Sequence, residues 1–112
     1  MSDCIFCKII VGDIPARKVY EDDEVMAFHD IKPAAPVHLL VIPKQHIVSM
    51  LELEEAHAPL MGRIMTVAAQ LAREHGCNEG FRTVVNTGRV GGQEVYHLHM
   101  HVLGGQNVLP AM

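Results

Sequence analysis

The strongest constraint on this chain is the alternating pattern of residues 97–103, His-Leu-His-Met-His-Val-Leu. Alternation with a period of two predicts a β-strand, because successive side chains of a strand point to opposite faces of its sheet. On such a strand His97, His99 and His101 share one face, and the apolar residues between them share the other. Imidazoles act as nucleophiles, proton donors and metal ligands near neutral pH. We therefore expect a sheet with one face that carries chemistry.

Four further segments of the chain have the composition and flanking residues of strands. They are residues 18–21, 24–29, 37–42 and 81–86. The pair Asp22-Asp23 separates the first two segments, and we expect a tight hairpin there. Residues 4–11 are mostly apolar and predict one or two helical turns at the N-terminus.

A single long helix is predicted in the second half of the chain. Apolar residues recur with helical spacing over residues 60–71, and Gly76 is suited to end a helix. Ser49 and Glu52 have the spacing of a capping box, while Pro59 must stand at the helix start or kink its first turn. The sum is one α+β domain over residues 1–112: a five-stranded antiparallel sheet connected as a meander, one long helix and a short N-terminal helix.

Composition and charge narrow the classes of partner. The chain has 112 residues and a formal net charge of −4, which disfavours a nucleic-acid partner because phosphate backbones require a basic surface. The sequence contains no apolar run of the roughly 18–20 residues that span a bilayer and no signal-peptide pattern. Three cysteines cannot pair completely, which fits a reducing compartment. We therefore expect a cytoplasmic protein without a membrane segment.

The histidine pattern alone leaves more than one chemistry open. The glycine-rich segment 91–95 precedes it, and consecutive backbone N–H groups of such a loop can bind a phosphate. One imidazole could then attack phosphorus while a neighbouring imidazole protonates the leaving group. Three histidines on one strand face are equally suited to bind zinc and activate water. A purely structural role is the third alternative.

Several separated blocks of the sequence resemble the histidine triad (HIT) superfamily. His97, His99 and His101, with apolar residues between them, match its His-x-His-x-His signature. The blocks that resemble its nucleoside phosphoramidase branch, the histidine triad nucleotide-binding proteins, are residues 4–10, 28–31, 37–46, 85–86 and 91–97. The resemblance implies the HIT fold, a homodimer, and hydrolysis of purine nucleoside 5′-phosphoramidates to a nucleoside monophosphate and an amine, with no cofactor required for catalysis.

The resemblance also implies roles for individual positions. His99 matches the nucleophile that attacks the α-phosphorus and carries a covalent nucleotidyl intermediate. His101 matches the histidine that contacts phosphate and helps to protonate the amine, and His97 matches the one whose backbone orients the nucleophile. The fourth histidine of the site is matched by His38, and Asp30 matches the carboxylate that binds the ribose hydroxyls. The purine slot is matched by Ile9, Ile14, Phe28 and Ile31, and the positions around the phosphate by Asn86, Gly92, Gln93, Glu94 and Val95.

Two cysteines near the N-terminus form a separate motif. Cys4 and Cys7 have the spacing of half a structural zinc site. The resemblance implies that His46 and His97 would complete it, as in some relatives. The alternative is that both cysteines are small apolar residues of a short helix. A zinc ion held there would be structural and would take no part in the reaction.

The chain departs from the resembled branch at two places. Glu94 stands where some relatives have a serine that can donate to the phosphate or the leaving group. Because a carboxylate repels phosphate, we expect only the backbone to bind there. No tryptophan follows Gly104-Gly105, so the preferred amine is not predicted. The alternatives that stay open are a HIT-type dinucleoside polyphosphate hydrolase, a nucleotide-binding adaptor and a three-histidine zinc hydrolase.

Overall fold

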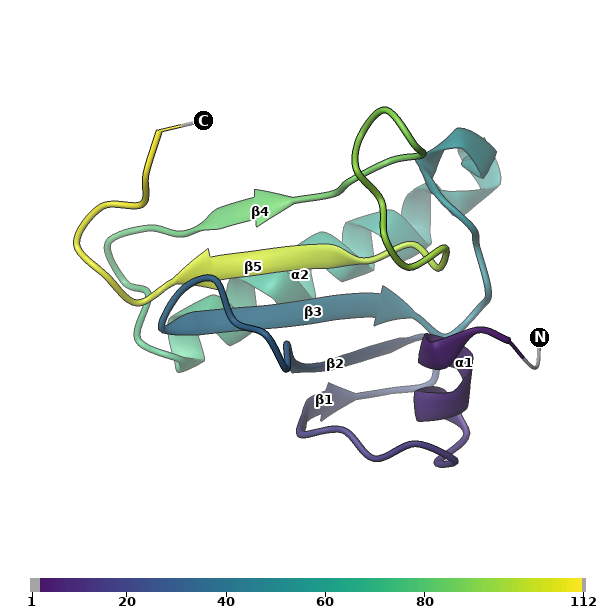
Figure 1. The fold of residues 1–112 in the computed structure, drawn as a ribbon, viewed down its shortest axis with the longest axis horizontal. Helices are drawn as coiled ribbons and strands as arrows, with labels where there is room; N and C mark the ends of the chain where they lie inside the picture. The colour runs from purple at the N-terminus through teal and green to yellow at the C-terminus, as the bar shows by residue number, and fades with distance from the viewer. Residues whose placement is uncertain (1–2, 112) are drawn as a thin grey trace.

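Five antiparallel strands form one sheet, and a long helix covers one of its faces (Figure 1). The structure, a computed structural model, describes residues 3–111. The strands are β1 (Lys18–Glu21), β2 (Val25–His29), β3 (Val37–Pro43), β4 (Arg82–Val84) and β5 (Met100–Gly104). The helices are α1 (Ile5–Ile10), α2 (Ala58–Glu74) and the two 3₁₀ turns η1 (Met50–Glu52) and η2 (Glu55–His57). The predicted fold class is therefore confirmed.

The order of the strands differs from the predicted meander. It is β1-β2-β3-β5-β4, so the last strand lies between β3 and β4 (Figure 1). The burial of Met100 and Val102 explains the central position of β5. In the middle of the sheet, the neighbouring strands on both sides help to shield these apolar side chains from water. The three-residue β4 takes the edge, where a short strand exposes few unpaired backbone groups. The hairpin of β1 and β2 is confirmed.

Of the two alternatives that Pro59 left open, the structure confirms a helix that begins near Ala58, whereas the capping-box pattern of Ser49 and Glu52 belongs to an earlier turn. The Ser49 hydroxyl accepts from the Leu51 N–H at 3.1 Å and thereby caps η1 rather than α2. The helix α2 starts at Ala58, and Pro59 stands in its first turn, where a missing N–H group leaves no hydrogen bond unmade. Gly76, with a φ of +87°, follows the helix end as predicted.

The two faces of the sheet have different partners. Alternate residues of β2, β3 and β5 pack against α2 in the larger core; they include Val25, Ala27, Leu39, Val41, Met100 and Val102. The intervening residues Met26, Phe28, Leu40 and Ile42 pack against Phe6 of α1 on the opposite face. Burial of each large aliphatic side chain contributes about 1.5–3 kcal/mol. His101 is opposite Leu40 in the pairing of β3 with β5, which directs the histidine pattern toward the α1 side.

The strand prediction for residues 97–103 is correct only from Met100 onward. The Leu98 N–H donates to the Ile47 carbonyl at 2.7 Å, and the Pro43 carbonyl accepts from the His97 ring at 2.8 Å. The backbone of Leu98 is therefore bonded to the segment that follows β3, the His97 ring is bonded to the end of β3, and residues 97–99 lie outside the strand ladder. No helix among residues 3–111 is long and apolar enough to cross a membrane.

Candidate active site

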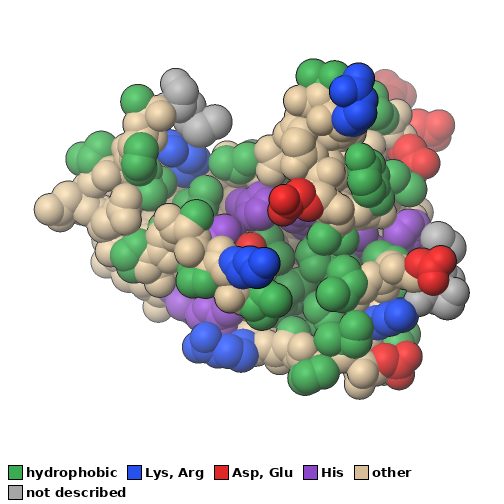
Figure 2. Space-filling view, in the orientation of Figure 1, with side chains coloured by type: hydrophobic (Ala, Val, Ile, Leu, Met, Phe, Trp, Pro, Cys, Tyr) green, Lys and Arg blue, Asp and Glu red, His purple; other side chains and the backbone are tan. Residues whose placement is uncertain are grey.

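A cavity of about 450 Å³ opens on the α1 side of the sheet. Figure 2 shows histidine side chains at the floor of a hollow in this face, with acidic side chains beside them. The predicted site residues that line the cavity are Ile9, Ile14, Phe28, Asp30, Ile31, His38, Asn86, Gly92, Glu94, Val95, His99 and His101. Of the predicted catalytic and nucleotide-binding residues, Gln93 and His97 do not line it. The fold thus brings together residues from α1, β2, β3, β5 and the loop before β5.

Several lining residues were not predicted from the sequence. They are Ile5, Phe6, Pro15, Ala16, His29, Lys32 and Leu40. Leu40 could have been found, because it lies two residues after His38 on a predicted strand and so shares its face. Phe6 could not, because its contact with His99, an edge-to-face pair with ring centroids 5.2 Å apart, depends on where α1 packs.

The hydrogen bonds of His99 determine which of its nitrogens carries the proton. Its Nδ1 lies 2.7 Å from the carbonyl oxygen of His97. Because a carbonyl can only accept, Nδ1 donates, and in the neutral ring Nε2 keeps its lone pair. The ring is 7% exposed and lines the cavity. His99 therefore presents a nucleophilic nitrogen in a fixed orientation.

A chain of three groups determines the proton position on His101. The Ala34 N–H donates to Nδ1 of His38 at 2.9 Å, so the neutral His38 ring carries its proton on Nε2. That Nε2 lies 2.9 Å from Nδ1 of His101 and 3.4 Å from the Asp30 carboxylate. His38 therefore donates to His101, whose own proton then resides on Nε2. The result is a donor nitrogen on His101 beside the acceptor nitrogen of His99.

Burial favours the neutral form of the His38 and His101 rings. It lowers the pKa of His101 to about 4, with a further contribution from His99 and His38. Burial also lowers the pKa of His38, and the nearby Asp30 carboxylate opposes that shift. Both rings are consequently neutral at pH 7 in the free protein.

The loop between β4 and β5 contributes backbone donors at positions other than the predicted glycines. The N–H groups of Gly91, Gly92 and Gln93 donate to carbonyls within the loop, at 3.0–3.2 Å. Within residues 3–111 the N–H groups of Glu94 and Val95 have no such partner, and both residues line the cavity. These two amides are therefore the ones free to bind an anion.

The glycines and Gln93 shape that loop instead. A side chain on Gly91 would collide with the backbone of Thr87, and Gly92 has a φ of +77°, which favours glycine. The buried Gln93 side chain donates to the carbonyls of Val48 and Val95 at 2.7 and 3.0 Å and accepts from the Gly88 N–H at 2.8 Å. All the hydrogen bonds of the Gln93 side chain therefore fix the conformation of this loop.

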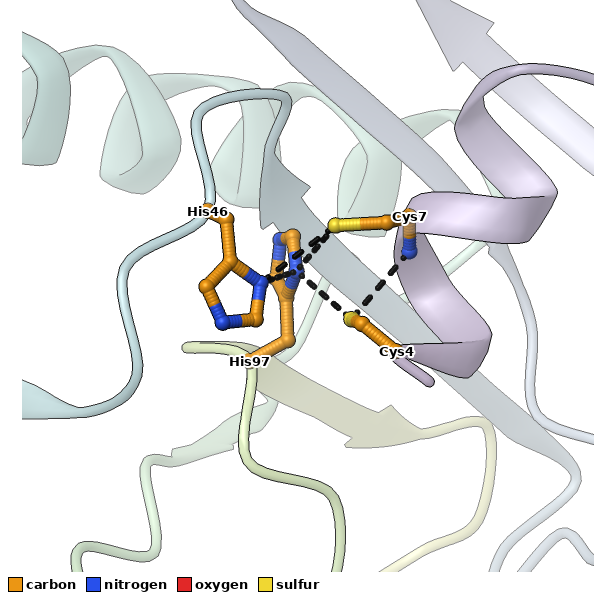
Figure 3. A group of neighbouring side chains, drawn as sticks. All are labelled: Cys4, Cys7, His46 and His97. Atoms are coloured by element: carbon orange, nitrogen blue, oxygen red, sulfur yellow. Dashed lines mark hydrogen bonds between the residues drawn. The ribbon is translucent and has the colours of Figure 1, made fainter. Parts of the chain in front are cut away.

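The four predicted metal ligands come together outside this cavity (Figure 3). Cys4 and Cys7 lie at the start of α1, His46 in the loop after β3, and His97 before β5. The His97 Nδ1 lies 3.3 Å from the Cys4 sulfur, 3.6 Å from the Cys7 sulfur and 3.2 Å from the His46 Nδ1. Burial raises the pKa of the Cys7 thiol, with a further contribution from the neighbouring Cys4.

The geometry separates this cluster from the histidines of the cavity. His97 donates from Nε2 to the Pro43 carbonyl at 2.8 Å, and its Nδ1 faces the cysteines. Both of its nitrogens are therefore directed away from the cavity that His99 and His101 line. His38, His101 and Asp30 also lie close together, but the Nε2 of His38 carries a proton and cannot ligate a cation. A three-histidine zinc site is disfavoured on these grounds.

Comparison with known proteins gives one consistent result. The family described as "Scavenger mRNA decapping enzyme C-term binding" matches residues 3–111. The purine nucleoside phosphoramidase of Escherichia coli K12 is 48% identical over 112 residues, which cover 99% of this chain and 94% of that protein. The HIT family hydrolase of Legionella pneumophila Philadelphia 1 has a TM-score of 0.91 and 46% identity, over 94% of this chain and 95% of that one.

A zinc-bound relative is similar as well. The Zn-bound histidine triad family protein of Mycobacterium smegmatis has a TM-score of 0.82 and 34% identity, over 95% of this chain and 77% of that one.

Proposed function

Since this chain belongs to the histidine triad family and is a hydrolase of that family, we propose that it hydrolyses purine nucleoside 5′-phosphoramidates. The products are a nucleoside monophosphate and an amine. The name of the 48% identical E. coli relative supports this substrate class. The cavity supports it too, because Ile9, Ile14 and Phe28 offer a purine an apolar wall and the Asp30 carboxylate can accept from ribose hydroxyls.

The reaction proceeds by two displacements at phosphorus. In the first, the lone pair of His99 Nε2 forms a bond to phosphorus while the bond from phosphorus to the amine nitrogen breaks. The amine departs with a proton from Nε2 of His101, which takes up a solvent proton when the anionic substrate binds and returns to the neutral ring as the amine leaves. In the second, water attacks phosphorus, the bond to His99 breaks, and the proton lost by the water returns to His101.

Charge on the phosphoryl oxygens is stabilised by the free backbone donors. The amides of Glu94 and Val95 supply two N–H groups that need no reorganisation during the reaction. A bound phosphoryl anion also favours the charged form of His101, whose pKa burial holds at about 4 in the free protein. Nucleotide binding thereby charges the proton donor when it is needed.

The single observation that carries the proposal is the hydrogen bond from His99 Nδ1 to the His97 carbonyl at 2.7 Å. It leaves the lone pair of the ring on Nε2, as a nucleophile requires, and the ring is held where that nitrogen can reach a bound phosphoryl group.

The proposal is tested with adenosine 5′-phosphoramidate, wild-type protein and His99→Ala, each with excess EDTA. We expect hydrolysis by the wild type that EDTA does not reduce, and a loss of at least about 10³-fold in the variant. Mass spectrometry of a quenched wild-type reaction is expected to show an adenylyl group on His99. Loss of wild-type activity in EDTA would instead favour metal-assisted hydrolysis, and nucleotide binding without turnover would favour a nucleotide-binding adaptor.

We further propose that Cys4, Cys7, His46 and His97 hold a structural zinc ion. Zinc bonds of about 2.0–2.3 Å in a tetrahedral site place neighbouring ligand atoms about 3.3–3.8 Å apart. The S–N distances of 3.3–3.6 Å and the N–N distance of 3.2 Å fit that geometry closely. The donation from His97 Nε2 to Pro43 also fits, because it leaves Nδ1 free to ligate. The ion would fix α1 and His97 and take no part in catalysis.

A metal count on protein purified without chelator tests the zinc proposal. We expect close to one equivalent of zinc per chain, and Cys7→Ser is expected to lose it while His99→Ala retains it. Less than a tenth of an equivalent in the wild type would contradict the proposal.

We also propose that the protein is a homodimer. The edge strand β4 leaves one row of backbone groups without a neighbouring strand, and Met65 on α2 is 61% exposed. Sedimentation equilibrium is expected to give twice the chain mass, and a monomer at micromolar concentration would contradict this.

A further inference from the structure

Glu94 is a charged residue at the reacting end of the cavity whose side chain has no partner. It is exposed, and within residues 3–111 its carboxylate makes no ion pair or hydrogen bond. Its backbone N–H is one of the two amides free to bind the phosphoryl group. With the phosphoryl group bound at that amide, the carboxylate would lie within one side chain's length of it.

The other fixed charges that line the cavity come from a different loop, and one of them, the Asp30 carboxylate, lies 3.4 Å from Nε2 of His38. Asp30 and Lys32 stand in the loop between β2 and β3, where the Lys32 N–H donates to the Asp30 carboxylate at 2.8 Å. The lining residues around His99 and His101 that come from the loop before β5 are Gly92, Glu94 and Val95. None of these is a fixed cation, so a leaving group that departs past this loop meets the negative charge of Glu94.

Space for a leaving group adjoins Glu94. A neighbouring cavity of about 470 Å³ shares Ile5, Glu94 and Val95 with the first. Its remaining lining residues are Val48, Tyr96, a second carboxylate, Asp3, and the proposed metal ligands Cys4 and His46. An alkyl chain that leaves the phosphoryl group past Glu94 would find apolar walls and acidic groups here.

We propose that Glu94 is a specificity-determining residue that favours amine leaving groups bearing a second, positively charged ammonium group. This inference rests on the proposed phosphoramidase activity and names its substrate class: phosphoramidates of diamine-like compounds, rather than of neutral alkylamines or of anionic groups. An exposed carboxylate a few ångströms from an ammonium group changes relative rates about 5- to 20-fold, and salt weakens the effect. A polyphosphate leaving group is disfavoured by the same charge.

The test uses three adenosine 5′-phosphoramidates of equal chain length. Their amines are propylamine, 1,3-diaminopropane and β-alanine, which leave the distal end neutral, positive and negative. kcat/KM is measured for the wild type, Glu94→Gln, Glu94→Lys and the control Glu24→Gln. Glu24 is exposed in the turn between β1 and β2, and its side chain makes no hydrogen bond or ion pair within the described part of the chain.

We expect Glu94→Gln to lower kcat/KM for the diamine substrate about 5- to 20-fold and to raise it for the β-alanine substrate. The change for the propylamine substrate is expected to be smaller than that for the diamine substrate, and a Tm equal to that of the wild type, measured separately, shows that the variant is folded. Glu94→Lys is expected to reverse the preference, and 0.5 M NaCl to weaken the preference of the wild type but not that of Glu94→Gln.

Two outcomes overturn the inference in distinguishable ways. Equal changes for the three substrates, or the same changes in Glu24→Gln, would remove Glu94 as the determinant while the phosphoramidase activity stands. Failure of the wild type to hydrolyse any of the three would refute the proposed function, and the inference would fall with it.

Discussion

Proton positions on three imidazoles are decided by backbone groups that the sequence does not reveal. The His97 carbonyl orients His99, and the Ala34 N–H orients His38, which in turn orients His101. A donor and an acceptor nitrogen thus stand side by side, although the residues that bear them are chemically identical. The spacing of the histidines alone could not distinguish these roles, because each depends on the backbone group that faces the ring.

The relay through His38 gives a first prediction. His38→Ala removes the group that orients His101 through its Nδ1, so the Nε2 proton is no longer held in position for the amine. We expect kcat for a phosphoramidate of an alkylamine to fall about 10- to 100-fold. His38→Gln is expected to retain more activity, because its side-chain amide can still donate at that position.

A leaving group that needs no proton is the control for His38. The p-nitrophenyl ester of AMP releases a stable anion, and we expect His38→Ala to slow its hydrolysis much less. Equal losses on both substrates would show that His38 acts by holding the site together rather than by orienting a proton donor.

Among the elements, the hairpin of β1 and β2 is attached to α2 by one polar cluster. The Asp22 carboxylate accepts from the Glu24 and Val25 N–H groups at 2.8 Å each and from the Tyr20 hydroxyl at 2.6 Å. Arg63 of α2 donates to the same carboxylate at 2.9 Å. One side chain therefore closes the turn and joins two elements.

Removal of that carboxylate gives a second prediction. Asp22→Ala leaves two turn amides and a hydroxyl without their acceptor, so we expect a loss of about 1–3 kcal/mol in the free energy of unfolding, measured by urea denaturation. Asp23→Ala is the matched control. Asp23 is the exposed neighbour, and we expect a change within about 0.5 kcal/mol. Comparable losses in both variants would contradict the assigned role of Asp22.

The helices and strands also show which parts of the fold could be predicted from the sequence alone. The hairpin, the extent of α2 up to Gly76 and four strands were predictable from period and turn residues. The place of β5 between β3 and β4 was not, because strand order depends on which apolar faces remain to be covered after α2 has packed. Most residues that line the cavity were predictable through the family resemblance. The hydrogen bonds of the Gln93 side chain to Gly88 and Val48 were not, because they depend on the conformation of the loop.

For the whole molecule, buried neutral histidines predict sensitivity to mild acid. The pKa of His38 and that of His101 lie below the ordinary value in the folded state, so the unfolded chain binds more protons at pH below about 6.5. Their stability contribution is complete above that pH and is lost as the pH falls toward 4. We expect the Tm of EDTA-treated protein to be at least about 5 °C lower at pH 5 than at pH 7.5.

The variant His101→Asn separates the titration of His101 from that of other groups. His101→Asn is expected to show a smaller decrease in Tm over the same range. Glu21 does not contribute there, because Lys44 and Lys18 hold the pKa of its carboxyl at about 2 and its stabilisation is lost only at lower pH. A Tm that does not change between pH 7.5 and pH 5 would contradict the prediction.

His97 makes the two clusters of this protein energetically dependent on each other. Its ring belongs to the group formed by Cys4, Cys7 and His46, while its carbonyl oxygen holds His99. Independent sites give additive effects when they are mutated together, and sites that share a residue do not. Substitutions in the two clusters are therefore coupled. A change at Cys4 alters the effect that a change at His99 is measured to have. Position 97 cannot be adapted to the cysteine cluster without affecting the orientation of His99.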